Sequence, residues 1–153
     1  TQLLKEIKRE IKKASDKDEK IAFRLNGTSD IDFLYLLNKN LDFDIELLNY
    51  DKVYFYDYTK SIARAKRYKD FKNYTLTFSK SETNDKEVKE ALNLGINVAA
   101  VFKDNLPQKY KGIKVIDGDF SDLEMINHKN IILGLKAKGD AKKDKTGFVI
   151  TNY

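Results

Sequence analysis

The chain has 153 residues, of which 41% are hydrophobic and 35% are charged, so it is long enough for one globular domain and too apolar to be disordered. It contains no cysteine, which excludes disulfides, thiolate metal sites and an iron–sulfur cluster within this chain. Its net charge of +5 mildly favours anionic partners such as phosphates or nucleic acid. No apolar stretch approaches the ~20 residues that cross a bilayer, so we expect a cytoplasmic protein that has no membrane partner.

The first segment of the chain predicts an amphipathic helix. Within residues 1–14, apolar side chains recur at three- and four-residue spacing, and most of the basic residues lie on the opposite side. The polar run "SDKDEK" then breaks the pattern. We expect a helix and linker over residues 1–18 and βα units over residues 19–153. We expect residues 1–153 to form a single α/β domain, and Thr1 in place of an initiating Met leaves open whether this domain is the C-terminal part of a larger protein.

After this helix, short β-rich runs alternate with helical stretches. Strands are expected at residues 21–25, 53–56, 74–78, 98–102, 114–116, 131–135 and 148–151. Helices or helical turns are expected at residues 31–40, 44–50, 61–71 and 84–95. The last of these is the clearest, because Thr83 or Asn84 can cap its start and Gly95 can supply the left-handed residue after its end.

This order of elements predicts the fold class. A β-α-β-α order requires crossover connections and therefore a mostly parallel sheet. Several runs, such as "NVAAVF", are apolar on both faces, as strands are where helices cover the sheet. The expected fold is α/β, with a mostly parallel sheet of about six strands and flanking helices. A complete (β/α)8 barrel needs ~250 residues, so the sheet should be open or form a partial barrel.

Polar and charged residues recur directly after the expected strands. The carboxyl ends of parallel strands share one edge of the sheet, here called the strand-end rim, where α/β proteins bind ligands. Five such clusters therefore predict one site built from distant segments. The candidate ligand- or phosphate-binding residues are Arg24, Asn26, Gly27, Thr28, Ser29, Lys60, Ser79, Ser81, Lys136 and Lys138. Weaker candidates, for a Mg²⁺ or Mn²⁺ site, are Asp30, Asp57, Glu82, Asp117 and Asp119.

Helix capping explains part of this pattern without any ligand. Ser, Thr, Asp and Asn commonly cap helices that follow strands, and Ser29 or Asp30 is expected to cap a helix that begins near Ile31. Capping does not explain the cations at the strand ends, which need partners if they are half-buried: Arg24, Lys60, Lys136 and Lys138. Three interpretations stay open, namely an anion site, a divalent-cation site and a structural ion-pair network.

Familiar catalytic signatures are missing from the sequence. It holds no Walker loop, GxGxxG, GxSxG or HExxH, and its single histidine, His128, lies in an expected loop, where we interpret it as a solvated residue. Two stretches, residues 58–74 and 134–148, interleave basic residues with aromatic ones. Surfaces of that composition suit single-stranded nucleic acid, although a solvated lysine-rich face has the same composition.

Six motifs resemble those of an uncharacterised family encoded mainly by bacteriophages and mobile elements, the gene 88 protein family. In chain order they are "RLNGTSDIDF", "YFYDYTK", "YTLTFSKSE", "NVAAVF", "VIDGD" and "LKAKGDAKKDKTGF", and the likeness spans about residues 2–150. The resemblance implies a phage or plasmid origin and brings no established activity. Members usually carry an upstream cysteine-rich region and look like distant relatives of radical-SAM-type partial barrels, a pattern from which this cysteine-free chain departs.

The leading hypothesis is a phage-type α/β protein that binds a phosphate-bearing ligand, a nucleic acid or a nucleotide, at the strand-end rim. One alternative is a non-catalytic interaction protein, such as a virion component or an inhibitor of a host factor, whose partner is a host or phage protein. Another is a metal-dependent phosphoesterase that uses Mg²⁺ or Mn²⁺. The sequence leaves open whether the protein is an enzyme and which cofactor, if any, it needs.

Overall fold

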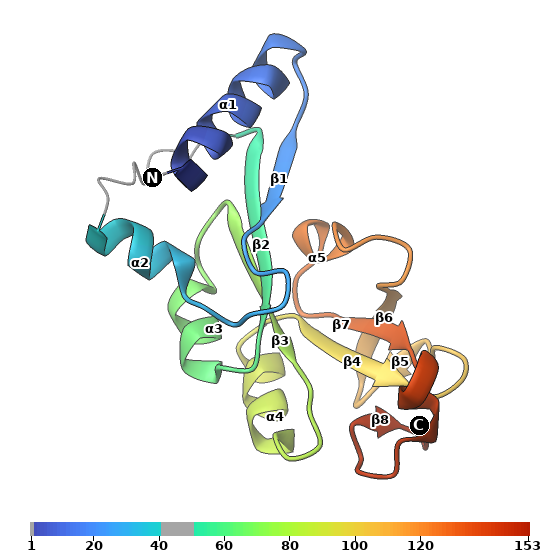
Figure 1. Ribbon diagram of the computed structural model, residues 1–153. Helices are drawn as coiled ribbons and strands as arrows, with labels where there is room; N and C mark the ends of the chain where they lie inside the picture. The colour runs from blue at the N-terminus through green and yellow to red at the C-terminus, as the bar shows by residue number, and fades with distance from the viewer. Residues whose placement is uncertain (1, 41–50) are drawn as a thin grey trace.

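The computed structural model of the protein describes residues 2–40 and 51–153 (Figure 1). The expected helix at residues 44–50 lies outside these residues. The helices are α1 (Gln2–Asp16), α2 (Phe33–Asn40), α3 (Ile62–Tyr68), α4 (Asp85–Asn93), α5 (Glu124–Asn127) and a short 3₁₀ helix (Gly139–Lys143). The strands are β1 (Ile21–Arg24), β2 (Val53–Thr59), β3 (Tyr74–Ser79), β4 (Val98–Phe102), β5 (Lys109–Tyr110), β6 (Ile113–Asp117), β7 (Ile132–Lys136) and β8 (Val149–Ile150).

The strands form one sheet in the order β1-β2-β3-β4-β7-β6-β5, with β8 paired to β4. β1, β2, β3, β4, β7 and β6 run parallel to their neighbours, while β5 and β6 form an antiparallel pair. The sheet is not closed into a barrel. The α/β class with a mostly parallel sheet is therefore confirmed, and the sheet is open.

The two faces of the sheet are covered unequally (Figure 1). Side chains of α1, α2 and α3 pack with β1, β2 and β3, and side chains of α3 and α4 pack with β3, β4 and β7, all on one face. On the other face, Met125 of α5 packs with Ala99 and Leu133 and with the rings of Tyr56 and Tyr58. Within the described residues, no helix is long and apolar enough to cross a membrane.

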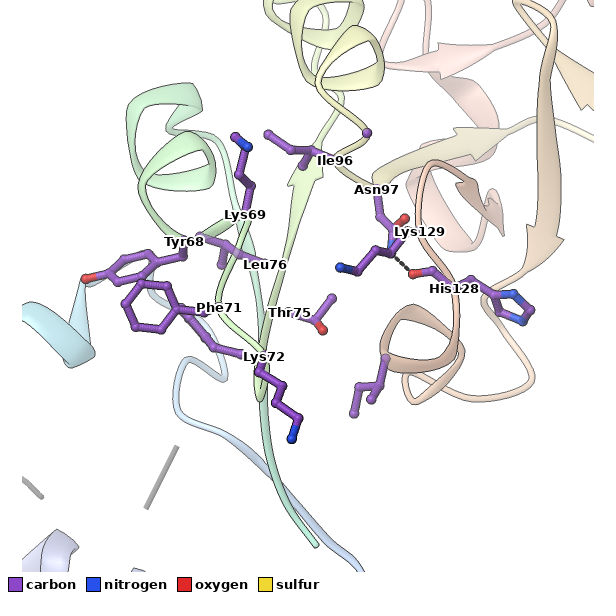
Figure 2. Close-up of a pocket in the computed structure, with 13 residues that line it drawn as sticks. Tyr68, Lys69, Phe71, Lys72, Thr75, Leu76, Ile96, Asn97, His128 and Lys129 are labelled. Atoms are coloured by element: carbon purple, nitrogen blue, oxygen red, sulfur yellow. Dashed lines mark hydrogen bonds between the residues drawn. The ribbon is translucent and has the colours of Figure 1, made fainter. Parts of the chain in front are cut away.

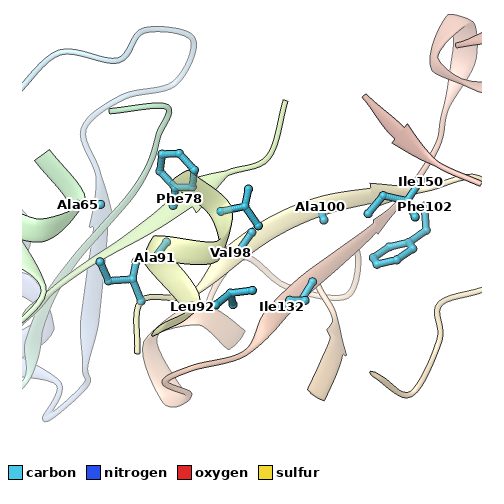
Figure 3. Close-up of a cluster of buried hydrophobic side chains, with 11 residues drawn as sticks. Ala65, Phe78, Ala91, Leu92, Val98, Ala100, Phe102, Ile132 and Ile150 are labelled. Atoms are coloured by element: carbon cyan, nitrogen blue, oxygen red, sulfur yellow. The ribbon is translucent and has the colours of Figure 1, made fainter. Parts of the chain in front are cut away.

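The largest buried cluster surrounds β4 (Figure 3). Phe78 and Phe102 are 0% exposed in it, and Val88, Ala91 and Leu92 of α4 belong to the same cluster. Gly134 on the neighbouring strand β7 is buried, and an added methyl group there would lie 2.7 Å from Val115 Cγ1. The apolar run at residues 98–102 is therefore a strand buried on both faces, as its sequence predicts.

β3 and β4 diverge soon after they meet. They pair only at Phe78–Val98 and Ser79–Ala99, whereas β7 follows β4 over its whole length. β8 pairs with Val101 and Phe102, so it takes the side of β4 that β3 has left. The ammonium of Lys80, 7% exposed, spans the gap by donating to the Gly147 carbonyl oxygen at 2.8 Å.

Each expected strand is present, with differences at the ends. β2 continues to Thr59, beyond its predicted end at residue 56, because Asp57 and Thr59 are buried on the same face as Val53 and Phe55. β5 and α5 were not expected. α5 is one short turn held by the buried side chain of Met125, which an isolated sequence pattern of four residues does not reveal.

The predicted end of α4 is confirmed, and the predicted start of α2 is not. Gly95 follows α4 with a positive φ of 73°, as predicted. Asn84 stands at the N-cap position of α4, but its side chain binds Ser79 and Ser81 instead of the first turn of the helix. α2 begins at Phe33 and is capped by Asp32, whose Oδ1 accepts from the Tyr35 N–H at 3.1 Å. The prediction that Ser29 or Asp30 caps this helix is therefore wrong.

Candidate functional site

A hollow of about 310 Å³ lies where β1, β2 and β3 end. Because these strands are parallel neighbours, their carboxyl ends bring three sequence-distant segments to one place. The lining residues, here called the carboxyl-end hollow, are Thr28, Ser29, Asp30, Tyr58, Thr59, Lys60 and Ser79. The structure thus brings together candidates from the first three of the five predicted clusters.

Asn26 and Asp57 form a buried base for the turn that follows β1. Asp57 is 1% exposed, and its two carboxylate oxygens accept from the Asn26 N–H at 2.9 Å and from Asn26 Nδ2 at 3.1 Å. The Asn26 Oδ1 in turn accepts from the Ser29 hydroxyl at 2.8 Å and from the Ile31 N–H at 3.1 Å. Asn26 and Asp57 therefore shape the turn and do not themselves line the hollow.

Asp30 connects the turn to the end of β2. Its Oδ2 accepts from the Thr59 hydroxyl at 3.0 Å and from the Lys60 N–H at 2.8 Å. Its Oδ1 lies 2.5 Å from an Arg64 guanidinium nitrogen. These three contacts explain why Asp30 is not the cap of α2: its carboxylate is directed towards β2 and α3.

Arg64 is the central residue that the sequence pattern missed, since it appeared only as part of a basic stretch. It is 5% exposed, donates to the Tyr74 hydroxyl at 2.8 Å and lies 3.7 Å from Asp57 Oδ2. Its Nε is buried with no hydrogen-bond partner within the described residues. The available signal was its position beside Ala65 on the apolar face of α3, where a buried cation needs acidic partners.

Burial controls the titration of this network. It raises the pKa of the Asp57 carboxyl, while hydrogen bonds from Asn26 and the charge of Arg64 act in the opposite direction. Burial also raises the pKa of the Tyr74 phenol, and the neighbouring Asp57 charge adds to that effect. The pKa of Tyr68 rises to about 12, through burial and its hydrogen bond to Asp32. Both phenols therefore stay protonated at neutral pH and act as hydrogen-bonding groups.

Arg24 lies on the other face of the sheet edge, beside the ring of Tyr58. Its guanidinium carbon is 5.0 Å from the ring centroid, and one of its nitrogens is 3.2 Å from Asp122 Oδ2. The Tyr58 hydroxyl donates to Asp122 Oδ1 at 2.8 Å, and burial raises the pKa of that phenol. Asp122, which sequence reasoning also missed, thus ties the segment before α5 to one wall of the hollow.

A second polar group lies at the ends of β6 and β7. Asp119 accepts from Lys138 Nζ at 2.7 Å and from the Lys136 N–H at 2.8 Å, and the Lys138 hydrogen bond is the main reason that its pKa is lowered. Asp117 Oδ1 accepts from the Asp119 N–H at 2.9 Å. None of these four residues lines the carboxyl-end hollow.

The remaining candidates stand apart from the hollow. Ser81 donates its N–H to Asn84 in the turn before α4, and the Gly27 carbonyl accepts from Arg24 at 3.4 Å. Glu82 is exposed. The five carboxylates proposed as metal ligands do not gather, since the described residues contain no group of three or more His, Cys, Asp or Glu able to hold a metal ion. His128 Nε2 lies 3.3 Å from Glu124 Oε2 at the end of α5.

The geometry defines an open-sheet α/β protein with a polar hollow at the ends of its first three strands. The family model described as Gene product 88 matches residues 1–152. The chain therefore belongs to the Gene product 88 family, a family of bacteriophage gene products, and the resemblance drawn from its six motifs is confirmed. No curated protein matches the chain, and neither does any solved structure.

Proposed function

We propose that the carboxyl-end hollow binds the phosphate of a nucleotide or of a nucleic acid. The observation that carries the proposal is the convergence of hydroxyl groups and one ammonium group from three strand ends. Thr28 and Ser79 supply aliphatic hydroxyls around the hollow, and Lys60 supplies the positive charge. The Ser29 hydroxyl also lies there, but it already donates to Asn26. Hydroxyl and ammonium donors of this kind suit phosphate oxygens.

The charges around the hollow support an anionic ligand. Asp30 is the one acidic residue among those that line it, and its carboxylate is already held by Arg64 at 2.5 Å and by two further donors. The Lys60 side chain forms no ion pair within residues 2–40 and 51–153, so its charge is free to attract a ligand. An anion in the hollow would therefore meet the unpaired ammonium of Lys60 and the Asp30 carboxylate, whose charge Arg64 neutralises.

The size of the hollow favours a nucleotide over a bare phosphate ion. At about 310 Å³ it falls at the lower end of the range for small-molecule sites. Tyr58 lines it with its ring held by Arg24 and Asp122, so an aromatic surface lies next to the phosphate-binding groups. An aromatic side chain at this place suits contact with a base.

The test is a titration of labelled single-stranded DNA, single-stranded RNA and a nucleoside triphosphate, at about 50 mM and about 200 mM salt. Lys60→Ala should weaken binding about tenfold, because it removes the one unpaired cation of the hollow. The matched control is Lys8→Ala, which removes the same charge from the exposed side of α1. No binding by the wild type, or equal affinities for the Lys60 and Lys8 variants, would refute the proposal.

A second comparison asks whether the β6–β7 group belongs to the same site. If the hollow alone binds the ligand, the double variant Lys136→Ala, Lys138→Ala should weaken binding about twofold or less, through general electrostatics. A loss as large as that of Lys60→Ala would show that the ligand extends across the rim to β7.

A different class of function, a non-catalytic interaction protein, is favoured by one feature. Phe120 is 86% exposed and Leu123 is 45% exposed, and both lie in the segment between β6 and α5. Large apolar side chains exposed together mark surfaces that meet other proteins. Co-purification of a stoichiometric phage or host protein, lost in Phe120→Ser but retained in Lys60→Ala, would support this function over the first.

A further inference from the structure

A second pocket lies at the opposite end of the sheet, beside the beginnings of β3 and β4 (Figure 2). It encloses about 80 Å³ and shares no lining residue with the carboxyl-end hollow. Three segments form it: the turn between α3 and β3, the turn between α4 and β4, and the turn between α5 and β7. We call it the amino-end pocket, and its lining includes Lys69, Lys72, Thr75, Leu76 and Lys129.

The pocket exists because β3 begins well before its pairing with β4. The first paired residues are Phe78 and Val98, so the amino half of β3 has β2 on one side and the pocket on the other. The N–H groups of Phe78 and Lys80 point towards β4, where they bond Asn97 and Ala99. Because N–H directions alternate along a strand, the Leu76 N–H points the same way, to where β4 has not yet begun.

The charge of the pocket has one sign. Lys69, Lys72 and Lys129 line it, and no aspartate or glutamate does. Lys69 and Lys72 pair with Asp70 and Asp51, but both carboxylates are 82% exposed, so these ion pairs are weak. Lys129 has no ion-pair partner within the described part of the chain.

Two polar side chains of the amino-end pocket point into it (Figure 2). Lys129 extends across the pocket towards β3, and the Thr75 side chain points into the same space. The His128 ring is turned away from the pocket, consistent with its contact to Glu124 at 3.3 Å. An ammonium, a hydroxyl and a backbone N–H therefore face one small space.

We propose that the amino-end pocket binds a single phosphoryl group. Its volume of about 80 Å³ is the room of two or three water molecules, which is also the scale of one tetrahedral anion. Lys129 supplies the charge, while the Thr75 hydroxyl and the Leu76 N–H donate hydrogen bonds. This site is independent of the one proposed at the carboxyl ends of the strands.

The experiment is a titration of the ¹⁵N-labelled protein with inorganic phosphate, followed by backbone amide shifts. The Leu76, Gly95 and Lys129 amides should move with saturation, and sodium chloride at matched ionic strength should leave them in place. Lys129→Ala should weaken the apparent affinity about tenfold, and Thr75→Val, which keeps the shape of the side chain, about threefold. Lys142→Ala, which removes a charge from the 3₁₀ helix, is the matched control and should bind as the wild type does.

Absence of saturable shifts at these amides, equal shifts with chloride, or an unchanged affinity in Lys129→Ala would each refute the proposal. A second titration with a single-stranded oligonucleotide identifies the source of the phosphoryl group. Movement of the Leu76 amide with both probes assigns the site to a phosphodiester backbone, and movement with inorganic phosphate alone assigns it to a free phosphate or monoester. Lys60→Ala should leave these shifts unchanged, which separates this test from that of the carboxyl-end hollow.

Discussion

β2 and β4 are parallel strands of the same sheet, yet their buried residues differ in kind. All five residues of β4 are apolar, and it ends at Phe102, which is 0% exposed. β2 begins with Val53 and Phe55 on its helix-covered face and then places Asp57 and Thr59 at the next two buried positions. Polarity at these two positions needs Asn26, Asp30 and Arg64 as partners, and those partners shape the carboxyl-end hollow.

Apolar burial and polar burial carry different information about a site. Burial of Phe102 is favourable by itself, because removing apolar surface from water stabilises the fold. Burial of Asp57 is unfavourable unless hydrogen bonds and an opposite charge compensate it. A carboxylate kept 1% exposed at the end of a strand is therefore a stronger sign of a candidate site than a buried phenylalanine is.

The largest effect on stability should come from truncating a buried apolar side chain at the end of β4. Phe102→Ala should lower the free energy of unfolding by about 4 kcal/mol, because it leaves a cavity and removes edge-on contacts to the rings of Tyr110 and Tyr153. Urea denaturation measures the loss. Ligand binding at the carboxyl-end hollow should persist in the folded fraction. A loss below about 1 kcal/mol would contradict the burial described here.

The next largest effect on stability should come from substituting the buried carboxylate of β2. Asp57→Asn should lower the free energy of unfolding by about 3 kcal/mol, because an amide nitrogen would face Asn26 Nδ2 and the Arg64 guanidinium in place of an accepting oxygen. Asp70→Asn is the matched control, at a carboxylate 82% exposed, and should change stability by less than about 0.5 kcal/mol. Equal stability of the two variants would mean that β2 does not depend on its polar partners.

A smaller effect isolates one hydrogen bond of the network. Tyr74→Phe keeps the ring that packs edge-on against Tyr68 and removes the hydroxyl that accepts from Arg64 at 2.8 Å. The expected loss is about 1 kcal/mol by urea denaturation. Tyr54→Phe, which removes a hydroxyl bound to the Asp51 carbonyl at the exposed start of β2, provides the comparison and should cost less.

The smallest effect is a dependence on pH. Because burial raises the pKa of Asp57 above its unfolded value of about 3.9, the folded state holds this proton more tightly than the unfolded state does. The stability that Asp57 contributes is therefore fully present below its unfolded-state pKa. It declines as the pH rises through the raised folded-state pKa. The stability of the wild type relative to Asp57→Asn should shrink from pH 4 upwards in urea titrations. A difference that grows with pH would show that Arg64 dominates and that the pKa is lowered.

Much of the fold follows from local patterns in the sequence. The runs at residues 21–25, 74–78 and 98–102 mark strands because they are rich in residues that favour strands. The parallel arrangement follows from the helices between them. β5 and α5 were not predicted, because elements of two and four residues carry no period. They depend on contacts with other elements, such as the pairing of Tyr110 with Ile113 and the packing of Met125 against Leu133.

The candidate site was predicted as a place and not as a set of contacts. The polar residues after β1, β2 and β3 do converge, as parallel strand ends require. Their partners could not be read from the sequence, because Arg24 meets Asp122 across 98 positions and Asp30 meets Arg64 across 34. Helix-capping preferences predicted Asp30 at the start of α2, but its carboxylate instead pairs with the buried guanidinium of Arg64.

The late position of β8 in the chain has a consequence for synthesis. β8 follows β4 in the chain only after β5, β6 and β7, yet it pairs with the outer half of β4 in the middle of the sheet. Until the ribosome has released the residues of β8, the side of β4 that β3 has left presents unpaired amide and carbonyl groups, a template for pairing with another chain. A chain truncated after Phe148 should therefore form aggregates during expression, while a chain that retains Val149 and Ile150 should remain monodisperse.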